Sequence, residues 1–202
     1  MFTGIVQGLG EVKSIDDRSG LRTMIVAVGA GSSRPVQTGA SVSISGICLT
    51  VTKIDGNEIT FDIMGESLNK TTLGSLMIGD QMNVERSATI GDEIGGHLMS
   101  GHVYSTVEII KVDQPENNYV LTFKVAPELI KYILPKGFIG LDGCSLSVVD
   151  VDKIKNTFTV WLIPETLRVT TFQRKKVGDQ VNLEIDSRTQ AIVDTVENYL
   201  KK

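Results

Sequence analysis

The stretch Gly46-Ile-Cys-Leu-Thr-Val51 returns later in the chain as Gly143-Cys-Ser-Leu-Ser-Val148. Glu66-Ser-Leu-Asn-Lys-Thr-Thr-Leu73 returns in the same order as Glu165-Thr-Leu-Arg-Val-Thr-Thr-Phe172, and residues 79–85 and 1–6 return at 178–184 and 98–103. The offset drifts only from 97 to 99 residues, so the copies differ by small changes in their loops. The sequence therefore predicts two homologous halves of about 95 residues each.

Each half has the pattern of β structure. β-Branched and aromatic residues fill residues 23–28, 41–44, 58–63 and 157–163, and turn residues such as Gly56-Asn57 separate such runs. Several short strands in about 95 residues predict a small antiparallel barrel or sandwich in each half. Short helices are predicted at residues 73–78 and 127–133, which we take as equivalent places in the two halves.

The C-terminal tail lies outside both copies. Ser187 and Gln190 have the spacing of a helix capping box. Five apolar residues then follow one face of a helix: Ile192, Val193, Val196, Tyr199 and Leu200. This face packs either on the chain's own barrels or against copies of itself, and the pattern leaves both alternatives open.

Composition narrows the class of protein without naming its chemistry. Among 202 residues, 20 Lys and Arg stand against 24 Asp and Glu, and this acidic balance argues against a nucleic-acid binder. No apolar stretch approaches the roughly 20 residues that cross a membrane, and the start lacks the pattern of a signal peptide. Two cysteines fit a reducing compartment, so we expect a cytoplasmic protein.

Both histidines, His97 and His102, lie in the segment Gly95-Gly-His-Leu-Met-Ser-Gly-His102. No further Cys or carboxylate completes a recognisable metal site near them, so no metal is expected. A structural role among the glycines is one alternative. General acid–base catalysis or ligand contact is the favoured one, because an imidazole titrates near pH 7.

Short polar side chains repeat on one strand face in both halves. Cys48 and Thr50 point the same way, as do Ser145 and Ser147, which predicts two related ligand pockets. A buried core thiol is the alternative for Cys48. The glycines Gly4 and Gly101 would let backbone amides approach a flat heterocycle. The carboxylates Asp62, Glu66 and Glu165 add polar groups, with helix caps or turn bonds as their alternative role.

These motifs resemble a known family over essentially the whole chain. MFTGIV at 1–6, GICLTV at 46–51, EIGGHLMSGH at 93–102, KGFIGLDGCSLSV at 136–148, LIPETL at 162–167 and VDTVE at 193–197 are similar to riboflavin synthases of the alpha-chain type, a family of duplicated lumazine-binding barrels. The resemblance implies an all-β chain of two six-stranded Greek-key barrels, at 1–96 and 97–186, and a C-terminal helix at 187–202. It also implies a homotrimer held by three such helices.

The resemblance further implies a transferase reaction. Two molecules of 6,7-dimethyl-8-ribityllumazine dismutate, and transfer of a four-carbon unit gives riboflavin and 5-amino-6-ribitylaminouracil, the last step of riboflavin biosynthesis. No cofactor is expected, because carbons and electrons are exchanged between identical molecules, and the glycines lack a dinucleotide-binding pattern. The protein has to orient two rings and move protons. Association with lumazine synthase is left open.

Site residues carried over from the family fall into three groups. The candidate catalytic residues are Cys48, His102 and Ser41, with Asp186 as a candidate proton partner. The expected lining of the N-terminal pocket is Gly4, Ile5, Val6, Cys48, Leu49, Thr50, Asp62, Ile63, Met64, Gly65, Glu66 and Ser67. The expected lining of the C-terminal pocket is Gly101, His102, Val103, Lys136, Ser145, Leu146, Ser147, Trp161, Leu162, Ile163, Pro164, Glu165 and Thr166. Cys144 is expected in the core.

A non-catalytic function competes with the enzyme. Lumazine proteins and related luminescence antennae share the duplicated fold and bind a lumazine or flavin as a chromophore. They generally lack the cysteine and histidines of this chain, whereas Cys48, His97 and His102 are all present here. The enzyme is therefore the favoured reading of the sequence.

Overall fold

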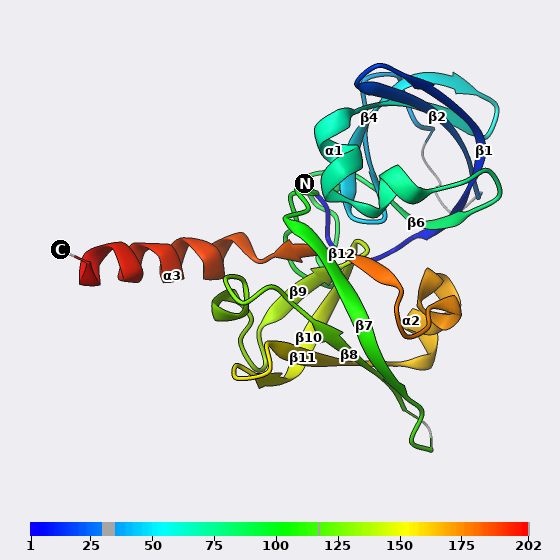
Figure 1. Ribbon diagram of the computed structural model, residues 1–202. Coiled ribbons are helices and arrows are strands. Elements are labelled where there is room, and N and C mark those ends of the chain that lie inside the picture. The colour runs from blue at the N-terminus through cyan, green and yellow to red at the C-terminus, as the bar shows by residue number, and fades with distance from the viewer. Residues whose placement is uncertain (30–34, 117, 202) are drawn as a thin grey trace.

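Two closed antiparallel barrels make up most of the chain (Figure 1). The computed structural model describes residues 1–29, 35–116 and 118–201. The first barrel, which we call the N-barrel, contains β1 (Gly8–Arg18), β2 (Leu21–Val28), β3 (Ser41–Ile44), β4 (Ile47–Asp55), β5 (Glu58–Met64) and β6 (Gln81–Arg86). The second, the C-barrel, contains β7 (Ser105–Asp113), β8 (Tyr119–Lys124), β9 (Phe138–Leu141), β10 (Cys144–Asp152), β11 (Thr157–Leu162) and β12 (Gln180–Ile185).

Strand order confirms both the all-β class and the duplication. The N-barrel runs β1-β2-β5-β4-β3-β6, and the C-barrel closes in the matching order β7-β8-β11-β10-β9-β12. The alternation within β4 separates the two faces of the barrel wall: Leu49 and Val51 are buried, while Cys48 and Thr50 lie on the outer face. The apolar cores therefore fill the barrels, and the polar positions of the repeat face outward.

The helices differ from the sequence prediction. After β5 come α1 (Gly65–Lys70) and the 3-10 turn η1 (Thr72–Ser75), and after β11 come α2 (Pro164–Val169) and η3 (Thr171–Arg174). The counterpart of η1 is η3, and only the turn η2 (Ile130–Tyr132) forms near residues 127–133, so the predicted equivalence was wrong. Thr71 stops α1 because its hydroxyl bonds the Ser67 carbonyl at 2.6 Å and accepts the Leu73 N–H at 3.2 Å.

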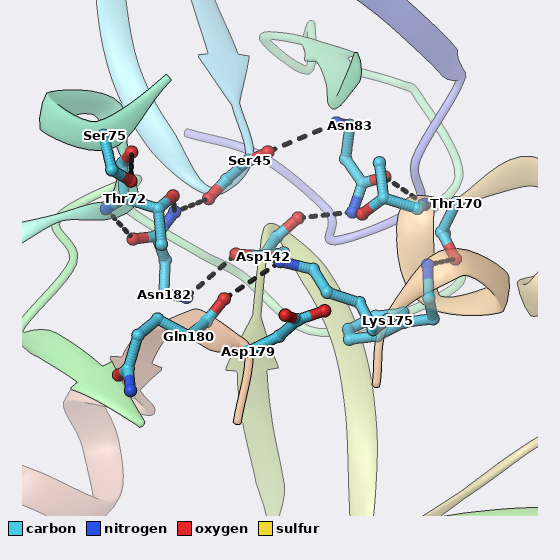
Figure 2. Close-up of polar contacts among 12 residues, drawn as sticks. Ser45, Thr72, Ser75, Asn83, Asp142, Thr170, Lys175, Asp179, Gln180 and Asn182 are labelled. Carbon is cyan, nitrogen blue, oxygen red and sulfur yellow. Dashed lines mark hydrogen bonds and ion pairs between the residues drawn. The ribbon is translucent and has the colours of Figure 1, made fainter. Parts of the chain in front are cut away.

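A symmetric polar joint connects the barrels (Figure 2). The Asn83 amide donates to the Asp142 carbonyl at 2.8 Å, and the equivalent Asn182 amide donates to the Ser45 carbonyl at 2.9 Å. Each asparagine oxygen also accepts a backbone N–H at 2.8 Å, from Thr171 and Thr72 respectively. Both asparagines, Ser45, Asp142 and Thr171 are buried and Thr72 is half-buried, so the joint fixes the two barrels relative to each other.

The C-terminal helix α3 (Ser187–Leu200) extends away from both barrels (Figure 1). Its N-cap is Asp186, whose carboxylate accepts the N–H groups of Arg188 and Thr189, so the predicted cap at Ser187 was one residue late. Val193 packs on the C-barrel core, whereas Ile192, Val196, Tyr199 and Leu200 are 52–78% exposed. Among the described residues, no helix has the length and apolar character to span a membrane.

Candidate active site

The segment that precedes each barrel lies on the other barrel. The Cys48 N–H in β4 donates to the Gly101 carbonyl at 2.9 Å, and the Ser145 N–H in β10 donates to the Gly4 carbonyl at 2.8 Å. Val6 belongs to the C-barrel core, and Val103 packs against the N-barrel core. We name residues 2–6 the leading segment and residues 99–103 the linking segment; they pair with each other through two hydrogen bonds between Phe2 and Met99.

This crossing corrects the expected composition of the two pockets. Residues 4–6 were predicted with Cys48, and residues 101–103 with Ser145, because each segment was assigned to the barrel that follows it in sequence. In the structure the linking segment lies beside Cys48 and the leading segment beside Ser145. A Cβ on Gly101 would lie 2.6 Å from the Cys48 Cβ, and one on Gly4 would lie 2.4 Å from the Ser145 Cβ. Both positions also have positive φ, so steric contact and backbone conformation each require glycine there.

The N-barrel site brings together three of the four candidate catalytic residues. Ser41 in β3 pairs with Thr50 in β4, and Cys48 lies two residues along the same outer face. His102 directly follows the carbonyl that Cys48 binds, and its side chain is exposed. A thiol and a hydroxyl thus share the outer face of the β3–β4 pair, and the segment that carries the imidazole lies directly beside them.

Asp186 lies apart from this group. Its carboxylate caps α3 and also accepts the Thr189 hydroxyl at 2.9 Å. The proton role expected for Asp186 therefore stays a prediction, and the structure shows a capping role instead.

The C-barrel site holds the second histidine. His97 is 8% exposed, its Nδ1 lies 2.6 Å from the Ser145 hydroxyl, and its ring stacks on Phe138 with centroids 5.1 Å apart. Burial lowers the pKa of His97, while the charge of Asp186 raises it in part. A neutral imidazole therefore orients Ser145, the counterpart of Cys48. Of the two roles that the sequence leaves open for His97, the buried contact with Ser145 fits the structural one.

The remaining predicted residues divide by face. The side chains of Val6, Leu49, Ile63, Leu146 and Leu162 are at most 8% exposed and belong to the barrel cores, so only their backbone can meet a ligand. The other predicted residues lie on the outer face, in the adjoining segments or in the helices α1 and α2: Ile5, Asp62, Met64, Gly65, Glu66, Ser67, Lys136, Ser147, Trp161, Ile163, Pro164, Glu165 and Thr166. Cys144 is buried in the core as predicted.

The two helix carboxylates beside the sites have local partners. Glu66 pairs with Lys70 at 2.8 Å within α1, and Glu165 pairs with Arg168 at 2.6 Å within α2. The hydrogen bonds from these cations lower the pKa of both carboxyls. Both groups are solvent-exposed and ionised near neutral pH. Their bonds are ion pairs within a helix, not the cap or turn bonds considered as their alternative role.

Comparison with known proteins places this arrangement in a family. The "Lumazine binding domain" family matches the chain twice, over residues 3–87 and 100–186. The riboflavin synthase of Escherichia coli (strain K12) is 53% identical over 201 residues, which cover 99% of this chain and 93% of that protein. The chain belongs to the riboflavin synthase family.

Other relatives of the riboflavin synthase family agree over the full length. The riboflavin synthase of Chlamydia pneumoniae is 44% identical over 200 residues, covering 99% of this chain and 97% of that protein. Among solved structures, LumP complexed with riboflavin superposes with a TM-score of 0.83 at 26% identity and covers 93% of this chain and all of that one. The fold of this family thus holds both enzymes and a flavin-binding protein.

Proposed function

We propose that this chain catalyses the dismutation of two 6,7-dimethyl-8-ribityllumazine molecules into riboflavin and 5-amino-6-ribitylaminouracil. One molecule gives up a four-carbon unit and the other receives it, so carbon and electrons balance between the two substrates. The proposal needs proton transfer and orientation from the protein, both of which side chains supply.

The observation that carries this proposal is the pair of matched but chemically different sites. Cys48 and His102 belong to the N-barrel site, whereas Ser145 and His97 occupy the equivalent region of the C-barrel. A reaction between two copies of one substrate needs two related pockets with different tasks, one for the donor and one for the acceptor. A duplicated barrel whose copies have diverged at these positions meets that need.

We further propose that each working site forms between two chains of a homotrimer. Within one chain the site surfaces are open, since Met64, Trp161 and Ile163 are 71%, 51% and 65% exposed. A flat ring held by such a surface would keep one face in water unless a second barrel covers it. The exposed apolar face of α3 supports assembly through the C-terminal helices.

A direct experiment tests the reaction. The purified chain is incubated with the lumazine alone, and the appearance of flavin absorbance is followed over time. We expect one riboflavin for every two lumazines consumed, without any added cofactor. Binding of the lumazine with no flavin formed would instead support a chromophore-binding role, which the likeness to LumP favours as the second candidate.

The finer organisation completes the proposal. We propose domain boundaries at residues 1–96, 97–186 and 187–202, which limited proteolysis of the intact chain checks.

A cytoplasmic location is supported by two free thiols, Cys48 and Cys144. Association with lumazine synthase is tested by co-sedimentation of the two purified proteins.

A further inference from the structure

The linking segment is held by a single buried carboxylate. Glu184, in β12 of the C-barrel, is 5% exposed. Its Oε1 accepts the Ser100 N–H at 2.6 Å and the Ser100 hydroxyl at 2.9 Å, and its Oε2 accepts the Gly101 N–H at 3.1 Å. The Ser100 hydroxyl in turn accepts the His102 N–H at 3.2 Å. Glu184 thus fixes the backbone of three successive residues, the last of which is a candidate catalytic residue.

The leading segment is held in the same way by Glu85, in β6 of the N-barrel. Glu85 is 2% exposed, and its Oε1 accepts the Thr3 N–H at 2.7 Å and the Thr3 hydroxyl at 2.8 Å. Its Oε2 accepts the Gly4 N–H at 3.1 Å, and the Thr3 hydroxyl accepts the Ile5 N–H at 3.3 Å. Glu85 and Glu184 are equivalent positions of the repeat, so the duplication has kept both anchors.

Each anchor and the site it serves lie on opposite barrels. Glu184 belongs to the C-barrel, but the Gly101 carbonyl of the segment it holds binds Cys48 in the N-barrel. Glu85 belongs to the N-barrel, but the Gly4 carbonyl of its segment binds Ser145 in the C-barrel. The chain of contacts from carboxylate to site therefore crosses between the barrels in both directions.

We propose that Glu184 and Glu85 are positioning residues that act across the barrels, Glu184 for the site of Cys48 and His102 and Glu85 for the site of Ser145. This inference rests on the proposed function for the identity of the reaction, while the anchoring itself is a structural claim. A shift of a catalytic group by about 1 Å lowers turnover by up to about a hundredfold, so a loosened segment has a measurable cost.

Replacement of either glutamate by glutamine is the sharpest change. The glutamine amide keeps the volume and one carbonyl oxygen, but its NH₂ group faces the Gly101 or Gly4 N–H, where two donors oppose each other. Glu184→Gln and Glu85→Gln therefore form a matched pair in which only the affected segment differs. Glu11→Gln is the control, because Glu11 lies on β1 and pairs with Lys13 at an exposed surface.

The structural test uses hydrogen exchange and alkylation, so it does not depend on catalytic activity. In Glu184→Gln we expect amide hydrogen exchange at Ser100 and Gly101 to rise at least about tenfold, with faster alkylation of Cys48, while Thr3 and Gly4 stay as in the parent chain. In Glu85→Gln we expect faster exchange at Thr3, Gly4 and Ser145 and unchanged alkylation of Cys48. Equal changes of both segments in both variants would mean general loosening and would overturn the crossed assignment.

The functional test measures the rate of flavin formation by the parent chain and by each variant. Both variants should lower kcat at least about tenfold, and riboflavin should protect Cys48 from alkylation less well in Glu184→Gln alone. Parental kcat in a variant whose segment exchanges faster would overturn the positioning role. A parent chain that forms no flavin would instead overturn the proposed function, and the exchange and alkylation results would still decide the anchoring.

Discussion

The thiol groups of Cys48 and Cys144 lie in opposite surroundings. Burial raises the pKa of Cys144 to about 12, and the nearby carboxylates Glu85 and Asp142 add to this rise. Cys48 lies on the outer face of β4 and is partly exposed. Since only the thiolate reacts, iodoacetamide at pH 8 should label Cys48 and leave Cys144 unlabelled in the folded chain. Peptide mass spectrometry checks this, and Cys48→Ser should abolish labelling.

The candidate catalytic pair is tested at the same scale. Cys48→Ser and His102→Gln should each lower the rate of flavin formation at least about tenfold, because each removes a proton-transferring group from the N-barrel site. Riboflavin should still bind both variants, as shown by quenching of its fluorescence. Full activity in both would leave Cys48 and His102 as packing residues.

The short elements show where residue patterns mislead. A short helix is predicted at residues 73–78, yet helix α1 ends at Lys70, where the Thr71 hydroxyl bonds back to the Ser67 carbonyl. The same device at Thr170 ends α2, so the two halves agree with each other and differ from the prediction. Local side-chain bonds of threonine decided where these two helices end.

Removal of α3 tests its role in assembly. Its outer apolar face has no described contact with the barrels apart from Val193, and burial against other copies would contribute several kcal/mol at about 25 cal/mol per Å². A chain cut after Ser187 should therefore sediment as a monomer or dimer at micromolar concentration. A stable trimer of the truncated chain would contradict a dominant role for the helix.

The polar joint between the barrels includes an ion pair between Asp142 and Lys175. Burial raises the pKa of the Asp142 carboxyl, and Lys175, 3.2 Å away, lowers it in part. An acid whose pKa is raised by folding binds its proton more tightly in the folded state, so its contribution to stability falls as pH rises above the ordinary value of 3.8. Lys175→Met removes the compensating charge, so the free energy of unfolding should decrease more strongly as pH rises.

Thermal unfolding measures the effect. We expect Lys175→Met to lower the free energy of unfolding at pH 8, and to lower it by less at pH 5. Asp142→Asn in the same background should remove most of the difference between the two pH values. Equal losses at both pH values would show that Lys175 acts through packing.

Subunit mixing tests the site at the scale of the assembly. Under the proposed function Cys48 and His102 serve one site of one chain, so mixing Cys48→Ala with His102→Ala chains should restore no activity. Mixing Cys48→Ala with Ser147→Arg, which fills the C-barrel site, should restore it, because about a quarter of the interfaces then pair two intact sites. Failure of the second mixture, with hybrid trimers shown to form, would mean that each site works within one chain.

The sequence by itself determined the duplication, the barrel strands and the outward polar positions, because period-two alternation and repeated motifs are local signals. It also gave Glu85 and Glu184 equivalent positions at the ends of the repeated segments 79–85 and 178–184, but assigned them no role. Only the tertiary structure decided that the linking segment lies on Cys48 and the leading segment on Ser145. In two equivalent halves, straight and crossed pairings satisfy the same backbone hydrogen bonds, so residue patterns cannot choose between them. In the structure the crossed pairing is the one in which Phe2 pairs with Met99 and the polar joint holds the barrels together.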